Sequence, residues 1–150
     1  MTNEQEARKA EGVSRHYKGA AIQVNWEPRL CIHSANCWRS LLDVFRPREA
    51  PWVRPDAASA DEIAWVVAAC PSGALTYERL DGGPPEPAPE VTTVAPQPDG
   101  PLYVRGHLRF VDAEGNLVRE GTRAALCRCG VSKNKPFCDN GHSIIGFRAD

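Results

Sequence analysis

The chain has 150 residues, a formal net charge of −1, 42% hydrophobic and 7% aromatic residues. A charge so close to zero creates no field that would draw the protein to nucleic acid or to an anionic membrane, so neither partner is expected. No stretch approaches the roughly 20 apolar residues of a membrane span, and the polar N-terminus lacks the apolar segment of a secretory signal. A cytoplasmic protein of one ordinary domain or two small ones is therefore expected.

Six cysteines stand out in a chain expected to be cytoplasmic. Stable disulfides are rare in that compartment, so the cysteine count predicts metal or redox chemistry instead. Two domains of about 60–70 residues would each bury only about 60% of their chain surface. Domains of that size often need a metal or disulfides for stability, which agrees with the same prediction.

The first third of the chain contains a tail, a strand and a helix, in that order. Residues 1–12 are polar and charged, which predicts a flexible tail. The stretch "AIQVNWE" at 21–27 alternates apolar and polar side chains, which predicts a half-buried strand. The stretch "CWRSLLDVF" at 37–45 spaces its apolar side chains as one face of a helix. The prolines of "PWVRPD" at 51–56 indicate a short extended or turn segment.

A second helix is predicted over residues 59–70, "SADEIAWVVAAC". Ser59 and Glu62 have the spacing of a capping box at its start, and Pro71 stops it after Cys70. A closing strand, "ALTY", follows. All four tryptophans occupy strand or helix positions that suggest core packing, namely residues 26, 38, 52 and 65.

A proline-rich stretch, "DGGPPEPAPE" at 81–90, cannot pack a core and predicts a linker between two domains. Short β-type runs follow at 91–95, 101–112 and 117–120, separated by turn signals. The predicted fold class is therefore α+β: a small domain with both helices and strands, followed by a small β-rich domain.

The most informative motif lies near the C-terminus and reads Cys127-x-Cys129-x8-Cys138-x3-His142. Two thiolates in a C-x-C motif can chelate one metal ion, and Cys138 and His142 could complete the site from a turn or helix start. The spacing alone leaves three alternatives: zinc with Cys3His ligation, an iron–sulfur cluster, or thiols without a ligand.

The residues between these four donors resemble the CDGSH iron–sulfur (mitoNEET-like) family. Its pattern, C-x-C-x2-[S/T]-x3-P-x-C-D-G-[S/A/T]-H, is matched here by Ser132, Pro136 and Asp139 as well as by the donors. Asn140 and Gly141 depart from it, since the sequence reads "CDNGH". Asn and Gly both tolerate left-handed backbone angles, so a slightly altered turn is expected with the ligand positions intact.

The resemblance covers about residues 91–148 and implies a CDGSH-type domain over 91–150 that binds a [2Fe–2S] cluster. Cys127 and Cys129 would bind one iron, and Cys138 and His142 the other. A neutral imidazole in place of a thiolate should raise the reduction potential, as histidine does in Rieske centres. Because a protonated imidazole cannot ligate a metal, the site is also expected to be labile in acid.

The other three cysteines, Cys31, Cys37 and Cys70, form a second candidate set. Bacterial ferredoxins use C-x2-C-x2-C with a distant Cys-Pro, and here Ser34 takes the middle position. Three thiolates favour a [3Fe–4S] cluster, whereas a [4Fe–4S] cluster would need Ser34, His33 or solvent as a fourth ligand. Buried cysteines without a ligand remain an alternative, because the free thiol packs well.

This N-terminal region resembles the divergent single-cluster ferredoxin-like domain. The stretches "CIHSANC", "PWVRPD" and "CPSGAL" carry the resemblance, which covers about residues 13–80. It implies one cluster of the 4Fe–4S type in that domain.

The sequence thus predicts a two-domain iron–sulfur protein for electron transfer or for cluster storage and delivery. A redox partner protein or an apo iron–sulfur acceptor is the expected partner, and a homodimer through residues 91–150 is expected. The sequence shows no Ser/His/Asp arrangement, phosphate loop or paired-carboxylate site, so no enzyme activity is predicted. The alternatives are a zinc-stabilised interaction module and a redox sensor that signals by losing its cluster.

Overall fold

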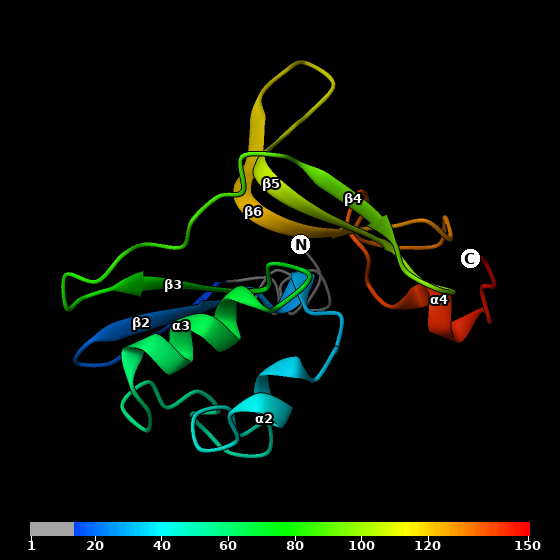
Figure 1. Cartoon of the computed structure of the whole chain (residues 1–150). Helices are drawn as coiled ribbons and strands as arrows, with labels where there is room; N and C mark the ends of the chain where they lie inside the picture. The colour runs from blue at the N-terminus through cyan, green and yellow to red at the C-terminus, as the bar shows by residue number, and fades with distance from the viewer. Residues whose placement is uncertain (1–13) are drawn as a thin grey trace, which may run out of the picture. The chain divides into compact units, whose positions relative to one another are not determined.

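The computed structural model describes residues 14–150 and divides the chain into two compact units. Among the described residues, the first unit comprises residues 14–70 together with Ala74–Glu86. The second comprises Pro71–Gly73 and Pro87–Asp150. Each unit contains one three-stranded antiparallel sheet and little helix, so the fold is α+β and mostly β (Figure 1).

The predicted tail, residues 1–12, lies outside the residues that the structure describes. Over residues 14–150, no helix is both long and apolar enough to cross a membrane.

The sheet of the first unit consists of β1 (Arg15–Lys18), β2 (Ile22–Trp26) and β3 (Leu75–Arg79), in that spatial order. The predicted strand at 21–27 and the closing strand are thus both present. Ile22 and Val24 point to the same side of β2 and are fully buried, as the period of two along a strand requires.

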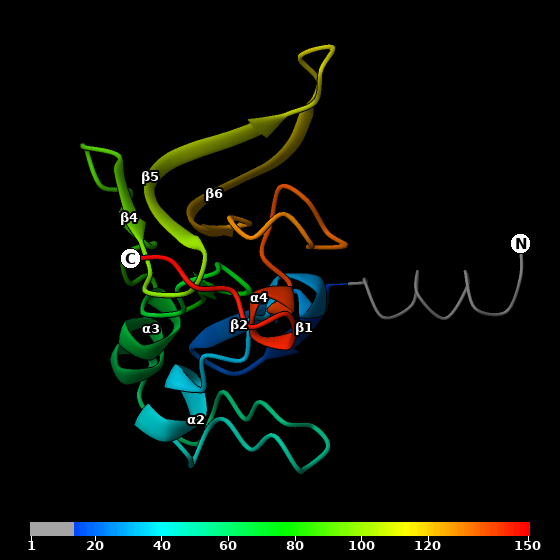
Figure 2. The same ribbon diagram turned by 90° about the vertical axis from the view of Figure 1, so that its right-hand side faces the viewer.

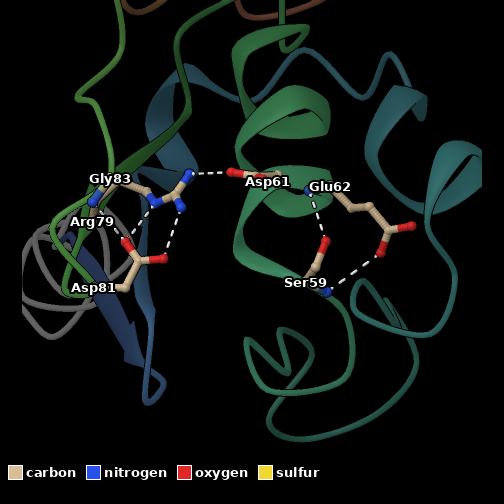
Figure 3. A network of polar contacts seen from close by, with 6 residues as sticks. All are labelled: Ser59, Asp61, Glu62, Arg79, Asp81 and Gly83. Carbon is tan, nitrogen blue, oxygen red and sulfur yellow. Dashed lines mark hydrogen bonds and ion pairs between the residues drawn. The ribbon is translucent and has the colours of Figure 1, made fainter.

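Helix α3 (Ala60–Ala68) confirms the helix predicted from the capping-box signature. The Ser59 side chain accepts a hydrogen bond from the Glu62 backbone N–H, and the Glu62 carboxylate accepts one from the Ser59 N–H (Figure 3). The apolar face of the helix packs into the same hydrophobic core as the sheet of this unit. The buried residues of this face are Ala60, Ile63, Ala64, Val66 and Val67.

An arginine at the end of β3 connects the sheet to α3 (Figure 3). The Arg79 guanidinium donates two hydrogen bonds to the Asp81 carboxylate, at 2.9 and 2.7 Å, and a third to Asp61 of α3 at 2.8 Å. The Arg79 side chain is only 9% exposed. This network therefore fixes β3, the start of α3 and the chain that leaves the sheet.

The helix predicted over residues 37–45 is only partly present, because α2 (Asn36–Ser40) ends early. Beyond it the backbone pairs with a later segment: the Arg54 N–H donates to the Val44 carbonyl at 2.8 Å, and the Arg46 N–H to the Trp52 carbonyl at 2.6 Å. Val44 becomes fully buried in this paired segment. Tertiary pairing therefore replaces the helical turns that the apolar spacing suggested.

The prediction that all four tryptophans belong to the core is wrong for two of them. Trp26 and Trp52 pack edge to face, with ring centroids 4.9 Å apart, and both pack against the core. Trp65 is 73% exposed and Trp38 is 38% exposed. Trp65 occurs at a position of α3 between inward-facing residues, where the helix turns its side chain to solvent.

The second unit contains β4 (Thr93–Pro96), β5 (Leu102–Val111) and β6 (Leu117–Leu126), in that order. The β5 and β6 strands run side by side as a long curved hairpin (Figure 2). Strand β6 extends well beyond the predicted run at 117–120. The chain then forms a loop that leads to a short helix, α4 (Gly141–Ile144).

Candidate metal centres

The cysteine-rich loop of the second unit folds back along the end of β6. The Cys127 N–H donates to the Pro136 carbonyl at 2.9 Å, and the Cys138 N–H donates to the Ala125 carbonyl at 2.8 Å. These two antiparallel hydrogen bonds bring the beginning and the end of the loop together. Leu126 and Phe137, which precede Cys127 and Cys138, thereby form an isolated antiparallel bridge.

The four predicted donors of this loop form two close pairs. The Sγ atoms of Cys127 and Cys129 are 3.9 Å apart, and Cys138 Sγ is 3.5 Å from His142 Nδ1. A tetrahedral metal site with bonds of about 2.3 Å to sulfur and about 2.0 Å to nitrogen has donor–donor edges of about 3.8 and about 3.5 Å. Each pair therefore has the spacing of two ligands on one metal ion.

Two pairs are the ligand set that a two-iron cluster needs, with one pair on each iron. Over residues 14–150, no group of three or more His, Cys, Asp or Glu side chains is arranged to hold a single metal ion. The six cysteines all lie in this range and none is in a disulfide.

Hydrogen-bond donors surround the Cys127 sulfur. Burial pushes the pKa of the Cys127 thiol upward, but backbone N–H groups of Ser132 and Gly130, the Cys129 thiol and the positive charge of Lys135 outweigh it. The pKa is therefore held below its ordinary value. The Gly130 nitrogen lies 3.3 Å from this sulfur. The thiolate, which is the form that binds metal, is stabilised here before any metal arrives.

Cys138 has a different environment because its side chain is buried. Burial raises the pKa of its thiol, and the negative charge of Asp139 and the two thiols Cys127 and Cys129 add to the effect. The Asn140 N–H, 3.3 Å from the sulfur, acts in the opposite direction. Because Cys127 and Cys129 contribute to the raised pKa of Cys138, the two donor pairs lie within electrostatic reach of each other.

The two residues that depart from the family motif, Asn140 and Gly141, form the turn that leads into α4. Asn140 has a left-handed backbone with φ of 71°, and α4 begins at Gly141. The Asp139 carboxylate accepts hydrogen bonds from the Lys133 and Gly141 N–H groups, each at 2.9 Å. The Lys133 bond is the main cause that lowers the pKa of Asp139. The turn therefore positions His142 in the first turn of α4.

The sequence analysis missed one residue of this region, Arg128, which lies between the two cysteines of the C-x-C motif. Its guanidinium donates to the carbonyls of Gly100 at 2.9 Å, Gln97 at 2.7 Å and Asp150 at 2.8 Å. Arg128 thereby attaches the donor loop to two other segments of the unit. Only its position between two donors could have singled it out, because its partners are backbone carbonyls distant in sequence.

The three cysteines of the first unit come from three different parts of the fold. Cys31 follows η1 (Pro28–Leu30), Cys37 lies in α2, and Cys70 follows the end of α3. Burial raises the pKa of the Cys37 thiol to about 11, and Cys70 and Cys31 both contribute. Burial likewise raises the pKa of Cys31, with a contribution from Cys70. The three thiols therefore lie within electrostatic reach of one another.

The loop between Cys31 and Cys37 has an unusual backbone. His33 and Ala35 both have positive φ, 58° and 65°, and neither is glycine. The loop curls so that the His33 N–H donates to the Cys31 sulfur and the Trp38 N–H donates to the Cys37 sulfur. Backbone N–H groups directed at cysteine sulfurs also tune the potential of iron–sulfur clusters.

A cavity of about 490 Å³ adjoins this loop, and Cys31 and Cys37 line it together with Trp26 and Trp52. The Trp26 side chain donates a hydrogen bond to the Cys31 sulfur. The Trp52 indole nitrogen is buried and has no hydrogen-bond partner among the described residues. The two thiols in this lining are donors of the kind that iron–sulfur clusters take, and Cys70, the third candidate, is not among the lining residues.

Two family models match the chain, one over each region. Residues 17–80 match the divergent 4Fe-4S mono-cluster family, and residues 99–143 match the iron-binding zinc finger CDGSH type. Both matches agree with the resemblances found in the sequence and point to iron–sulfur binding. The first description names a four-iron cluster, and the preference for a three-iron cluster finds no support.

The relatives found include "Uncharacterized protein YjdI" of Escherichia coli strain K12 and its counterpart in Escherichia coli O157:H7. Each is 37% identical to this chain over 69 residues, which is 46% of this chain and 91% of the relative. The chain therefore belongs to the same family as YjdI, and it contains a divergent 4Fe-4S mono-cluster domain followed by a CDGSH-type iron-binding domain.

Proposed function

We propose that this protein is an electron carrier with two iron–sulfur clusters. Cys127, Cys129, Cys138 and His142 hold a [2Fe–2S] cluster in the second unit. Three cysteines hold a [4Fe–4S] cluster in the first unit, namely Cys31, Cys37 and Cys70. Each cluster, when bound, accepts and releases one electron at a time.

The paired donors of the second unit are the observation that carries this proposal. Their separations, 3.9 and 3.5 Å, are close to the ligand edges of two tetrahedral metal ions. The mixed Cys3His set supports a cluster that is less negative, and therefore more easily reduced, than one with four thiolates.

The surroundings of both sites favour electron transfer over cluster delivery. Cys138 is buried, and in the first unit the rings of Trp26 and Trp52 line the cavity beside Cys31 and Cys37. An electron carrier must retain its clusters while the charge on each cluster changes. Burial of the ligands slows the loss of the clusters. The partner is a redox protein. The same two sites would serve cluster delivery only if their ligands could be readily exchanged for those of an acceptor protein.

Reversible reduction tests the proposal. The anaerobically reconstituted protein should be bleached by dithionite, show EPR signals of both reduced clusters, and return to its starting spectrum when cytochrome c is added as an electron acceptor. Transfer of the intact clusters to an apo-ferredoxin, faster than electron transfer to cytochrome c, would contradict the carrier role. A colourless protein that binds zinc would contradict both roles.

A further inference from the structure

An apolar hollow lies on the surface of the first unit, beside α2. It measures about 450 Å³, and Trp38, Leu42 and Pro47 supply its apolar lining. Leu42 is 61% exposed, and the other two side chains are exposed as well. Large apolar side chains that gather on a surface mark interaction sites, whereas single exposed ones are ordinary. The hollow is therefore a candidate for contact with another molecule.

The hollow adjoins a donor of the proposed cluster. Trp38 follows Cys37 directly in α2, and its backbone N–H donates a hydrogen bond to the Cys37 sulfur. The Trp38 side chain lines both this hollow and the cavity that Cys37 lines. A molecule seated in the hollow would thus contact the residue next to a cluster ligand. This gives an electron a short route between a cluster held by Cys37 and the surface.

The segment that forms the hollow, residues 38–54, is basic although the chain as a whole is not. It contains four arginines and two carboxylates, a net charge of +2, whereas the whole chain carries −1. All its cations are arginine, whose planar guanidinium can donate two hydrogen bonds to one carboxylate. Arginine is also enriched in protein interfaces, where lysine is depleted. The charge of this segment therefore complements an acidic protein surface.

Two of these arginines are available to a partner. Arg39 and Arg48 are exposed and form no ion pair within the part of the chain that the structure describes. Arg39 lies over the neighbouring tryptophan ring of the hollow, with 5.4 Å between its guanidinium carbon and the ring centroid. Arg48 is itself part of the lining. Glu49, by contrast, pairs with both Arg46 and Arg54, so its negative charge is already compensated.

We propose that this hollow, with Arg39 and Arg48 beside it, is the docking surface for an acidic redox protein that exchanges electrons with the cluster of the first unit. The inference rests on the proposed function and adds the partner's surface chemistry to it. Opposite charges steer the two proteins together, and the hollow takes an apolar side chain of the partner. The reduced cluster then loses one electron and the partner's redox centre gains it, with no bond made or broken.

Electron transfer to two acceptors of opposite surface charge tests the inference. All proteins carry Cys138→Ala, which removes the cluster of the second unit so that only the first unit donates electrons. Each is reduced, its cluster content is measured, and it is mixed in a stopped-flow spectrophotometer with plastocyanin, an acidic acceptor, or with cytochrome c, a basic one. The rate constants per cluster are compared at low and at high ionic strength.

Three substitutions alter the proposed surface, and one serves as the control. Arg39→Glu and Arg48→Glu reverse the charges beside the hollow, and Leu42→Ser removes an exposed apolar contact. Lys18→Glu makes the same charge reversal at an exposed residue of β1, outside residues 38–54. All four side chains are exposed, so the first unit should fold in every variant.

The rate with plastocyanin should fall as the ionic strength rises, because salt screens the attraction. Arg39→Glu and Arg48→Glu should each lower this rate roughly tenfold at low salt, and neither should lower the rate with cytochrome c. Leu42→Ser should lower the plastocyanin rate and leave its salt dependence unchanged. Lys18→Glu should change both rates by less than about twofold.

A plastocyanin rate that ignores both arginine reversals, or that Lys18→Glu lowers as much, would overturn the inference and leave the proposed function standing. A dimer in sedimentation that Leu42→Ser or Arg48→Glu dissociates would also overturn it, because the hollow would then hold a second copy of this chain. A cluster in the first unit that passes no electron to either acceptor would overturn the proposed function itself.

Discussion

Asn140 holds a backbone angle that most residues avoid, and it does so between Cys138 and His142, two donors of the same pair. A left-handed angle costs an ordinary residue about 1–2 kcal/mol, whereas glycine adopts it freely. Asn140→Gly should therefore leave the stability of the cluster-bound protein unchanged or slightly higher. Asn140→Ala should lower it by about 1–2 kcal/mol.

Thermal unfolding of both reconstituted variants, followed by the visible absorbance of the cluster, measures this difference. Equal melting temperatures for Asn140→Gly and Asn140→Ala would mean that the turn is not strained when the cluster is bound.

His142 is the donor of the second unit that a proton can displace most directly, because iron and proton compete for the same imidazole nitrogen. His142→Cys replaces the neutral ring with a thiolate and adds negative charge. The variant should have a lower reduction potential and lose its [2Fe–2S] absorbance more slowly in mild acid. His107→Ala, an exposed histidine of β5, is the control and should behave as wild type. Decay of His142→Cys at the wild-type rate would show that His142 is not the labile ligand.

The four donors of the second unit could be named from the spacing, because C-x-C and C-x3-H place ligands close together whatever the surrounding fold. The left-handed angle at Asn140 could be predicted as well, because few residue types accept it. Arg128 could not, since its partners are backbone carbonyls of segments that only folding brings near. Ser34, His33 and solvent were the alternatives for a fourth ligand in the sequence, and the structure lines the cavity with His33 but with neither Ser34 nor Cys70.

At the scale of elements, α3 could be predicted because its signals are local: a capping box, a helical apolar face and a terminating proline all agree. The helix over 37–45 could not be predicted correctly, because Val44 is buried by pairing with residues that follow a turn. Spacing within a short segment carries no information about such pairing. The link between Arg79 and Asp61 is likewise invisible in the sequence, where the two residues are 18 positions apart.

The ion pair between Arg79 and Asp81 makes the stability of the first unit sensitive to acid. Hydrogen bonds from Arg79 hold the pKa of Asp81 well below its usual range of about 3.9. A carboxylate with a depressed folded-state pKa stabilises the fold above its unfolded pKa, and that stabilisation is lost as the pH falls through the folded value. Asp81→Asn should therefore be less stable than wild type at pH 7, and the difference should shrink as the pH falls below about 4.

Urea unfolding of wild type and Asp81→Asn between pH 7 and pH 3, followed by tryptophan fluorescence, measures this convergence. Asp43→Asn, which changes an exposed carboxylate of the same unit, serves as the control and should track wild type. A stability difference for Asp81→Asn that stays constant over the whole range would show that the ion pair does not contribute through the charge of Asp81.

At the scale of the whole molecule, the two donor sets lie in separate units and share no residue. Cys70→Ala removes one of three thiolates in the first unit and should abolish the four-iron EPR signal while the [2Fe–2S] absorbance remains. Cys138→Ala should have the reciprocal effect. Loss of both clusters from either single change would mean that the two sites depend on each other for assembly.

Metal content tests the central claim most directly. Iron, acid-labile sulfide and zinc are measured per chain in the reconstituted full-length protein, with Mössbauer spectra to identify the cluster types. One [2Fe–2S] and one [4Fe–4S] cluster predict about six irons and about six sulfides per chain, with no zinc. About one equivalent of zinc with no sulfide would contradict the account, because it would show that the cysteine sites hold a structural metal ion instead of clusters.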